Sequence, residues 1–309
     1  MSRRASPLRA LTRWTFIAFA AAATVYACQG SLREPAPAPV VPDPSRWDRD
    51  TLNVAYLGHA SVLIGFGEVR LLTDPAFYDR IGLSIGPLTV GPKRLVRSAL
   101  GPDALPPLHA VLLSHAHMDS LDRPSLGALD APLVVVPERT GDLVDDLGFG
   151  RVVELRWGQR VEIGDVTVEA VPLAHWGRRW PWEGWRGYNG YLLTRGDVTV
   201  LFASDTAYTP ALGALGKKQP ITAAIIGNGA YDPWVRNHAT PEQVWQMFRE
   251  TGASWLLPIH WDTFRLGKEP VGDAMHRLVA AAGKDTERIV FRRIGETWTL
   301  RENGSAARR

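Results

Sequence analysis

Histidine and aspartate residues in this sequence recur directly after apolar segments. His115, His117 and Asp119 lie within five residues, each separated from the next by one residue. Imidazole nitrogen and carboxylate oxygen are ligands that Zn²⁺ binds in proteins. A single histidine at the end of a strand is more often structural. Six such residues together predict a metal site: His115, His117, Asp119, His175, Asp205 and His260.

The apolar segments before these residues are predicted β-strands. They cover residues 109–114, 166–172, 198–203 and 254–259. Ligands of open α/β sheets bind outside the carboxyl ends of the strands, so side chains that follow different strands are expected to meet at one edge. A rigid sheet also holds such donors in place with little loss of entropy on binding.

The rest of the chain is typical of an α/β protein rich in strands. Continuous apolar runs indicate strands covered on both faces, and more strands are predicted at 52–57, 61–66, 69–73, 133–137, 151–155, 190–194 and 223–227. Helices are predicted at 140–147, 240–252 and 271–282. Because there is no internal repeat and no second linker, residues 47–302 are expected to form a single domain of two sheets with outer helices. Residues 303–309 would be a tail.

The composition of the 309 residues excludes several classes of protein. The chain is 45% hydrophobic and 22% charged, which is ordinary for a globular protein and excludes a disordered chain, collagen and a coiled-coil rod. Cys28 is the only cysteine, so no disulfide forms within the chain. The net charge falls from +3 to −2 when the five arginines of residues 1–33 are left out. No nucleic-acid partner is therefore expected.

Residues 1–28 have the layout of an export signal. An arginine-rich start precedes the apolar segment 14–27, which is shorter than the about 20 apolar residues of a membrane-spanning helix. The residues that end at Cys28 resemble a bacterial lipobox, so Cys28 is a candidate for lipidation; the alternative is an uncleaved membrane anchor. Residues 29–46 are rich in proline and are expected to form an extended linker. The expected location is the bacterial cell envelope, on the membrane and facing the periplasm.

The metal-site motifs resemble those of the metallo-β-lactamase-fold hydrolases. The similarity lies in Ser-His-Ala-His-Met-Asp at 114–119, followed in order by His175, Asp205 and His260. The sequence around other strand ends is similar to the branch of N-acyl-phosphatidylethanolamine-hydrolysing phospholipase D and its bacterial relatives, at 58–64, 73–75, 172–176, 202–206 and 258–261. The resemblance covers about residues 52–275. It implies an α/β fold, a four-layer αββα sandwich of two mixed β-sheets.

The resemblance implies two metal positions. Three histidines would bind the first zinc ion: His115, His117 and His175. Asp205 would bridge the two positions, and Asp119 and His260 would bind the second zinc ion. The sequence departs from the family at Ser120, where the resemblance implies a histidine. Three protein ligands are enough for a catalytic zinc ion, so the expected cofactor is one or two zinc ions with a weakened second site.

Other polar residues are candidates for holding the ligands in place. The resemblance implies this role for His59 and Asp74, because a carboxylate that accepts a hydrogen bond from a ligand imidazole fixes its tautomer. Asp122 is a further candidate. The alternative for each is a plain turn or helix-cap residue. Two other histidines are expected to have no role in the site: His109 and His276.

His238 is a candidate for stabilising the transition state. It lies just before the predicted helix at 240–252, and in the phospholipase branch a histidine at this place faces the bound phosphate. A hydrogen-bond donor there would stabilise the oxygen that gains charge during the reaction. The alternative is an ordinary loop histidine near the start of a helix.

Residues 176–186 combine four tryptophans with three arginines directly after a candidate ligand. Indole rings suit a membrane interface and arginines pair with phosphate groups, so this segment is expected to bind a lipid substrate. The alternative is a packed lid over the site. The candidate substrate-binding residues are Trp176, Arg178, Trp180, Trp182, Trp185 and Tyr188.

The sequence therefore predicts a zinc-dependent hydrolase, and the resemblance favours a phosphodiesterase that acts on phospholipids. A zinc ion lowers the pKa of bound water to about 7 and so provides a hydroxide that attacks phosphorus. Asp119, Asp205 and His238 are the candidate catalytic residues. The residues leave two alternatives open, a carbonyl hydrolase such as a lactonase and a tethered lipid-binding protein without activity. The expected partners are a phospholipid or another small phosphodiester, and the membrane surface.

Overall fold

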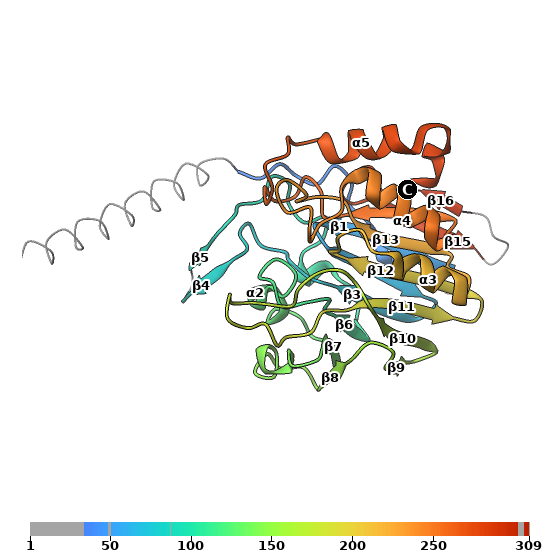
Figure 1. The fold of residues 1–309 in the computed structure, drawn as a ribbon. Helices are drawn as coiled ribbons and strands as arrows, with labels where there is room; N and C mark the ends of the chain where they lie inside the picture. The colour runs from blue at the N-terminus through green and yellow to red at the C-terminus, as the bar shows by residue number, and fades with distance from the viewer. Residues whose placement is uncertain (1–33, 49–50, 87, 302–305, 309) are drawn as a thin grey trace, which may run out of the picture.

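Two large mixed β-sheets make up most of the protein (Figure 1). The computed structural model describes residues 34–48, 51–86, 88–301 and 306–308. The first sheet has eight strands, in the spatial order β16 (Ala306–Arg308), β15 (Thr297–Arg301), β1 (Thr51–Gly58), β2 (Ser61–Phe66), β3 (Val69–Thr73), β6 (Ala110–Leu112), β7 (Leu133–Pro137) and β8 (Arg151–Leu155).

The second sheet has six strands. In spatial order they are β14 (Trp255–Ile259), β13 (Ala223–Gly227), β12 (Val198–Ser204), β11 (Gly190–Arg195), β10 (Val166–Val171) and β9 (Arg160–Ile163). A separate hairpin consists of β4 (Leu83–Ile85) and β5 (Leu88–Val90) and projects from the body of the protein (Figure 1). The predicted α/β fold with two mixed sheets is confirmed.

Three helices cover the outer face of the six-stranded sheet (Figure 1), namely α3 (Pro210–Lys218), α4 (Pro241–Thr251) and α5 (Asp273–Ala282). A short helix, α2 (Arg123–Leu126), follows the loop after β6. The structure also has four 3₁₀ helices, η1 (Pro44–Arg46), η2 (Pro102–Ala104), η3 (Gly141–Leu143) and η4 (Gly283–Arg288), among the described residues.

Two of the three predicted helices are confirmed. In α4, Thr240 and Gln243 form the expected capping box, and Gly252 ends the helix with φ 69°. The third prediction, a helix at 140–147, is wrong, because only the 3₁₀ helix η3 and irregular turns form there. The carboxylate of Glu154 accepts hydrogen bonds from three consecutive backbone N–H groups at 139–141. Val144 then leaves the helical region with φ −134°, so the turns that follow it do not continue as a helix.

Helix α3 and several short strands were not predicted. Thr209 caps α3 by accepting a hydrogen bond from Ala211 N, and Pro210 is its first residue. The segment contains two glycines, which disfavour a helix locally. At Gly216 a Cβ would lie 2.0 Å from the carbonyl oxygen of Thr251. Glycine is therefore required for the close approach of α3 to α4.

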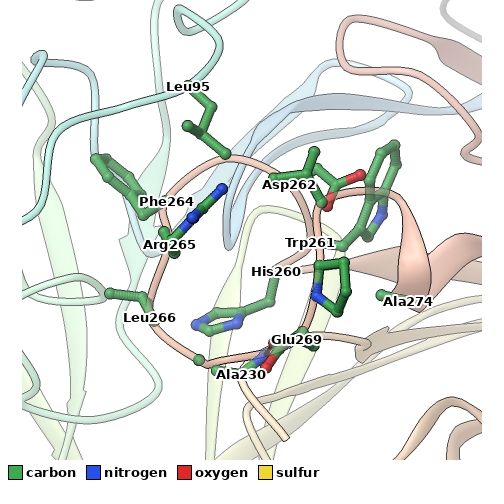
Figure 2. A pocket seen from close by; sticks show the side chains of 14 residues that line it. Leu95, Ala230, His260, Trp261, Asp262, Phe264, Arg265, Leu266, Glu269 and Ala274 are labelled. Atoms are coloured by element: carbon green, nitrogen blue, oxygen red, sulfur yellow. Dashed lines mark hydrogen bonds between the residues drawn. The ribbon is translucent and has the colours of Figure 1, made fainter. Parts of the chain in front are cut away.

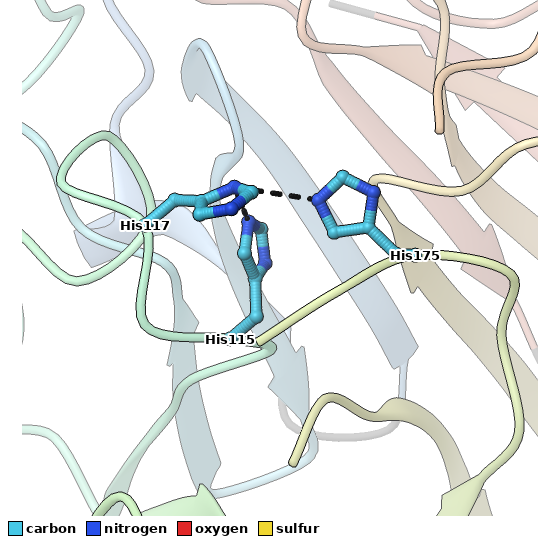
Figure 3. A group of neighbouring side chains, drawn as sticks. All are labelled: His115, His117 and His175. Carbon is cyan, nitrogen blue, oxygen red and sulfur yellow. Dashed lines mark hydrogen bonds between the residues drawn. The ribbon is translucent and has the colours of Figure 1, made fainter. Parts of the chain in front are cut away.

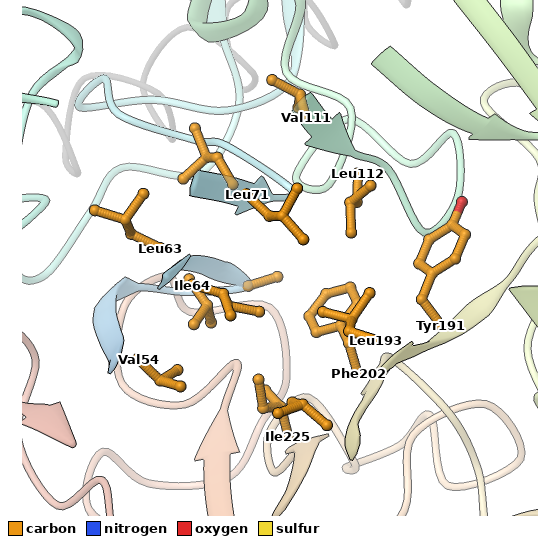
Figure 4. Close-up of a cluster of buried hydrophobic side chains, with 14 of the residues drawn as sticks. Val54, Leu63, Ile64, Leu71, Val111, Leu112, Tyr191, Leu193, Phe202 and Ile225 are labelled. Atoms are coloured by element: carbon orange, nitrogen blue, oxygen red, sulfur yellow. The ribbon is translucent and has the colours of Figure 1, made fainter. Parts of the chain in front are cut away.

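The main hydrophobic core lies between the two sheets (Figure 4). Val54, Ile64 and Leu71 from the eight-stranded sheet face Phe202 and Ile225 from the six-stranded sheet (Figure 4), and all five side chains are buried. A second cluster lies between the six-stranded sheet and its helices. Because both faces of this sheet are covered, its central strands are continuously apolar.

The strand directions bring the expected ligands to one edge. β2 is antiparallel to both β1 and β3, and β3 is parallel to β6, so β1, β3 and β6 end at the same edge of the first sheet. In the second sheet, β11 is antiparallel to both β10 and β12, and β12, β13 and β14 are parallel. The carboxyl ends of β10, β12 and β14 therefore also lie along one edge.

The described part of the proline-rich segment lies on the body of the protein. Ala36 N donates a hydrogen bond to Leu95 O, Arg97 N donates to Ala36 O, and Glu34 pairs with Arg97. Trp47 packs against β2 at Gly65, where a Cβ would lie 2.8 Å from the indole ring. The predicted signal segment, with Cys28, lies outside the described residues.

Two further features concern the ends of the chain and its helices. The expected tail at 303–309 includes β16, which pairs with β15. Among the described residues, none of the helices has both the length and the hydrophobicity needed to cross a membrane.

Candidate metal centre

The candidate ligands lie where strands end and the backbone turns sharply. His59, Asp74 and His260 directly follow β1, β3 and β14, and all three have positive φ values, as does Ser204 at the end of β12. Bulges disturb the pairing of β1 with β2 and of β12 with β13 just before His59 and Asp205. Left-handed backbone at non-glycine residues is costly and clusters at functional sites. The fold therefore holds these side chains in directions that a regular strand would not give them.

The first ligand cluster consists of three histidines (Figure 3). His115 Nε2 lies 2.8 Å from His117 Nδ1, and His175 Nε2 lies 3.4 Å from the same atom. The donors around a tetrahedral zinc ion are about 3.3 Å apart, given Zn–N distances of 2.0–2.1 Å. The loop after β6 supplies His115 and His117, and the loop after β10 supplies His175.

The second cluster consists of His59, Asp119 and His260. Asp119 Oδ2 lies 3.0 Å from His59 Nε2 and 3.3 Å from His260 Nε2. Asp205 lies between the two clusters, because its Oδ2 is 3.9 Å from His115 Nε2 and 3.1 Å from His260 Nε2. The structure thus brings together all six residues that the sequence nominated as ligands.

The ionisation of these groups suits a cation. Burial and the neighbouring histidines lower the pKa of His115 well below its usual value and that of His117 to about 4. Their imidazoles are therefore neutral at pH 7, which is the form that binds metals. Burial opposes the charge of His260, but Asp205 and Asp119 outweigh it and raise its pKa to about 10. A metal ion that binds His260 would therefore displace a proton from its imidazole.

Hydrogen bonds outside the clusters fix the tautomers of two ligands. Asp74 accepts hydrogen bonds from Ser114 N at 2.7 Å and from Ser114 Oγ at 2.6 Å. The Ser114 hydroxyl in turn lies 2.8 Å from His115 Nδ1, so Nδ1–H donates to it and the Nε2 lone pair faces the cluster. His175 Nδ1 donates in the same way to the backbone oxygen of Asn237 at 2.9 Å. Asp74 therefore acts on His115 through Ser114.

We expect Ser114→Ala to weaken metal binding about 10- to 100-fold, the usual cost of losing such a supporting hydrogen bond. The substitution removes the hydroxyl that connects His115 Nδ1 to Asp74. Competition with a chromophoric chelator measures the affinity. Ser84→Ala, in the exposed β4–β5 hairpin, is the control and should bind metal like the unaltered protein. Equal affinity of Ser114→Ala and the control would contradict the connection.

The residues present fit a bound metal ion. Both carboxylate oxygens of Asp205 are buried and accept no hydrogen bond among the described residues, and only Oδ2 has an ion-pair contact, at 3.1 Å from His260 Nε2. A buried carboxylate without hydrogen bonds is costly. Asp205 lies between two groups of convergent imidazole and carboxylate donors, which is the donor set that Zn²⁺ binds. A cation at this place would satisfy the oxygens of Asp205 that accept no hydrogen bond.

The chain is similar to several known proteins. A family model described as the Beta-lactamase superfamily domain matches residues 69–261, which include all six candidate ligands. The chain belongs to this superfamily. The predicted resemblance to metallo-β-lactamase-fold hydrolases is thereby confirmed.

Individual relatives agree with this membership of the superfamily. An uncharacterized protein of Mycobacterium tuberculosis is 33% identical over 267 residues, which are 81% of this chain and 69% of the relative. N-acyl-phosphatidylethanolamine-hydrolyzing phospholipase D 1 of Caenorhabditis elegans is 27% identical over 273 residues, which are 80% of this chain and 75% of the relative. The crystal structure of a possible metal-dependent hydrolase from Veillonella parvula has a TM-score of 0.65 at 15% identity and covers 80% of this chain and 98% of that one. The last likeness concerns the fold alone.

His238 lies beside both ligand clusters of this superfamily member. Its ring centroid is 5.1 Å from that of His175 and 5.4 Å from that of His260. Burial lowers its pKa to about 3, so the imidazole is neutral at pH 7. His238 and Asp205 also form a third group of convergent donors with His175. His238, in the loop before α4, thus places a neutral imidazole at the rim of the site.

Not every residue nominated from the sequence lies at the metal centre. Asp122 caps helix α2 by accepting hydrogen bonds from Ser125 N and Oγ, which was the alternative reading. His109 accepts a hydrogen bond from Arg70 N on an exposed part of the sheet, and His276 lies within α5. These two histidines are the ones for which no role was expected.

The tryptophan and arginine segment at 176–186 has an inner and an outer part. Trp176 stacks on His175 with ring centroids 5.2 Å apart and an interplanar angle of 5°. Trp182 and Trp185 are 68% and 51% exposed, and Trp180 stacks on Trp182. Arg178 is exposed. Tyr188 packs against Trp157 instead. The inner part of the segment thus packs against a candidate ligand, and the outer part exposes aromatic rings to solvent.

Two arginines of this segment bind the protein itself. Arg179 Nη1 donates to the backbone oxygens of Ala116 at 3.2 Å and Leu121 at 2.8 Å. These two hydrogen bonds hold the loop that carries His115, His117 and Asp119. Arg186 is buried and pairs with Glu183 and Asp142. Sequence reasoning did not assign a role to Arg179, since carbonyl acceptors on a distant loop leave no signal in residue types.

A small pocket adjoins the second cluster (Figure 2). Its wall is formed largely by the loop at 260–271, and the imidazole of His260 lies within it, with Leu95, Phe264 and Leu266 on one side. The carboxylate of Glu269 accepts hydrogen bonds from Ala230 N and Asp232 N and so holds the opposite wall. The candidate metal centre therefore opens into a recess with mixed apolar and polar lining.

Proposed function

We propose that this protein is a zinc-dependent phosphodiesterase that hydrolyses phospholipids, of the type that acts on N-acyl-phosphatidylethanolamine. The observation that carries the proposal is the pair of donor clusters joined by Asp205, whose buried oxygens have no hydrogen-bond partner among the described residues. Membership of the superfamily supports metal-dependent hydrolysis. The phospholipid is supported by the C. elegans relative, which is named for this activity.

The residues of this chain have distinct tasks in the proposed reaction. His115, His117 and His175 would hold one zinc ion, and Asp119 and His260 would hold the other, with Asp205 between them. When bound, the metals lower the pKa of water and withdraw charge from the phosphoryl oxygens. His238 is close enough to both clusters to donate a hydrogen bond to an equatorial phosphoryl oxygen, where charge develops. Trp176 limits the access of water beside His175.

Exposed apolar side chains support a substrate that lies in a membrane. Four residues of the β4–β5 hairpin are exposed, namely Leu83, Ile85, Leu88 and Val90. The hairpin joins the pocket region, because Arg94 bridges to Phe264 shortly after β5. With Trp182 and Trp185 these side chains would contact lipid. We extend the proposal to the location: an exported protein held at the bacterial membrane by its N-terminal segment, with lipidation at Cys28 and the enzyme facing the periplasm.

The test is a comparison of substrates on the purified full-length protein supplied with zinc. Vesicles that contain N-acyl-phosphatidylethanolamine, a soluble lactone and a β-lactam are offered in parallel. The proposal expects release of phosphatidic acid and N-acylethanolamine and loss of this activity after chelation. Faster turnover of the lactone would favour a carbonyl hydrolase. Vesicle binding without turnover of any substrate would favour a lipid-binding protein.

We expect Ile85→Ser combined with Leu88→Ser to lower kcat/KM on vesicle substrate about 10-fold or more. Each of these side chains is 61% exposed, and burying one in a lipid surface contributes about 1.5–3 kcal/mol. Turnover of a short-chain monomeric diester should not change, because the hairpin does not carry the ligands. Val41→Ser, at a residue that is 68% exposed outside the hairpin, is the control. An unchanged rate on vesicles would rule out lipid contact by the hairpin.

A further inference from the structure

His59 lies within the second donor cluster and not behind it. Donor atoms of His59, Asp119 and His260 all lie within 4.8 Å of one another, as do those of the three histidines of the first cluster. His59 Nε2 and His260 Nε2 approach the same oxygen, Asp119 Oδ2, at 3.0 and 3.3 Å. Two imidazole nitrogens and a carboxylate oxygen therefore converge on one point, which is the arrangement of a metal site.

The fold holds the His59 ring rigidly in this position. The backbone N–H of His59 donates to Thr263 Oγ1 at 2.8 Å, and His59 O accepts from His260 N at 2.7 Å. Its ring lies 4.1 Å from the ring of His260 and packs edge-on against Phe264 at 5.1 Å. The side chain is 1% exposed. Such a fixed donor loses little entropy when it binds a metal.

Ser120 leaves the second metal position short of a donor. The resemblance to the family implies a histidine there, yet the serine is buried and its hydroxyl has no hydrogen-bond partner among the described residues. Without that histidine, the position retains Asp119, Asp205 and His260. His59 provides a fourth protein donor from a different strand end, after β1.

We propose that His59 is itself a ligand of the second metal ion and supplies the nitrogen donor that Ser120 cannot. The inference rests on the metal dependence of the proposed function but not on the substrate. Four protein donors would then hold the second ion: His59, Asp119, Asp205 and His260.

The competing role is that of a positioning residue. In that case, His59 Nε2–H would only donate a hydrogen bond to Asp119 Oδ2 and keep the carboxylate in place. His59→Gln separates the two roles, because the glutamine amide can still donate to Asp119 but is a poor zinc ligand. His276→Gln is the matched control, since it also removes one imidazole, from helix α5 away from both clusters.

The experiment is a titration of the metal-free full-length proteins with Co²⁺, followed by absorption spectroscopy and by metal analysis after dialysis. For the unaltered protein and His276→Gln we expect two bound equivalents. For His59→Gln we expect the first equivalent to bind with an unchanged spectrum. The second should bind at least about 100-fold more weakly, with an altered visible band, because a nitrogen donor has been lost.

Two results would overturn the inference. One is a second equivalent that binds His59→Gln within about threefold of the unaltered protein and with the same spectrum, which would make His59 a positioning residue. The other is an unaltered protein that binds fewer than two equivalents. The titration needs no substrate, so failure of the phospholipid assay together with a His59-dependent second equivalent would reject the proposed function and leave this inference standing.

Discussion

Asp205→Asn should remove bound metal and lower turnover at least about 1,000-fold. Asp205 is the one carboxylate that lies between both clusters, 3.9 Å from His115 Nε2 and 3.1 Å from His260 Nε2. The amide has nearly the same shape but no charge, so neither metal position would keep its bridging anion. The expected loss exceeds the 10- to 100-fold that a supporting residue contributes to affinity or activity.

The measurement combines metal analysis after dialysis with initial rates on the best substrate of the parallel assay. Asp130→Asn is the matched control, because Asp130 is exposed in the turn after α2 and should retain both metal and activity. Circular dichroism and unfolding curves show whether Asp205→Asn remains folded. A folded Asp205→Asn protein with full metal content and full activity would contradict the assignment of this residue.

Phe202→Ala is expected to lower the free energy of unfolding by about 3–5 kcal/mol. Phe202 is fully buried on β12, and its ring faces the side chains of the opposite sheet (Figure 4). Truncation to alanine would leave a cavity in the layer that joins the two sheets, because the paired strands on both sides limit the collapse of the core.

Urea denaturation followed by tryptophan fluorescence measures this loss of stability. Trp182→Ala is the comparison, since this ring is 68% exposed and its removal should change the unfolding free energy by no more than about 0.5 kcal/mol. Equal midpoints for Phe202→Ala and Trp182→Ala would show that the two sheets do not share a continuous core at this point.

The positions of the six candidate ligands could be predicted because they depend on strand ends. The apolar runs at 109–114, 166–172, 198–203 and 254–259 end shortly before a histidine or aspartate, and the directions of the strands then place those residues at one edge. The assignment of these ligands to two metal positions came from the resemblance to the metallo-β-lactamase-fold hydrolases. Local sequence was sufficient here because parallel strands end at the same edge of a sheet, so the residues that directly follow them lie together.

Contacts between distant loops could not be predicted from the sequence. His59 and Asp119 are 60 residues apart, and their contact depends on how the loops after β1 and β6 cross the edge of the sheet. The clamp of Arg179 on Ala116 and Leu121 likewise uses backbone oxygens, which every residue carries. Asp122 has a carboxylate of the kind that could support a ligand, but it caps a four-residue helix that the sequence did not reveal.

The wrong helix at 140–147 has a related cause. The segment has acceptable helix formers, but the carboxylate of Glu154, on a strand that follows it, accepts the hydrogen bonds of its first N–H groups. A tertiary contact thus overrides local propensity. The reverse holds for α3, where packing of Gly213 and Gly216 against α4 stabilises a helix that its composition does not favour.

Anomalous diffraction from crystals grown with Zn²⁺ tests the central claim most directly. Data on either side of the zinc absorption edge locate the ions without reference to activity. We expect one peak bound by His115, His117 and His175 and a second bound by Asp119 and His260, with Asp205 adjoining both. A protein crystallised with excess zinc that shows no peak among these six side chains, or peaks only at other places on the molecule, would contradict a metal-dependent hydrolase.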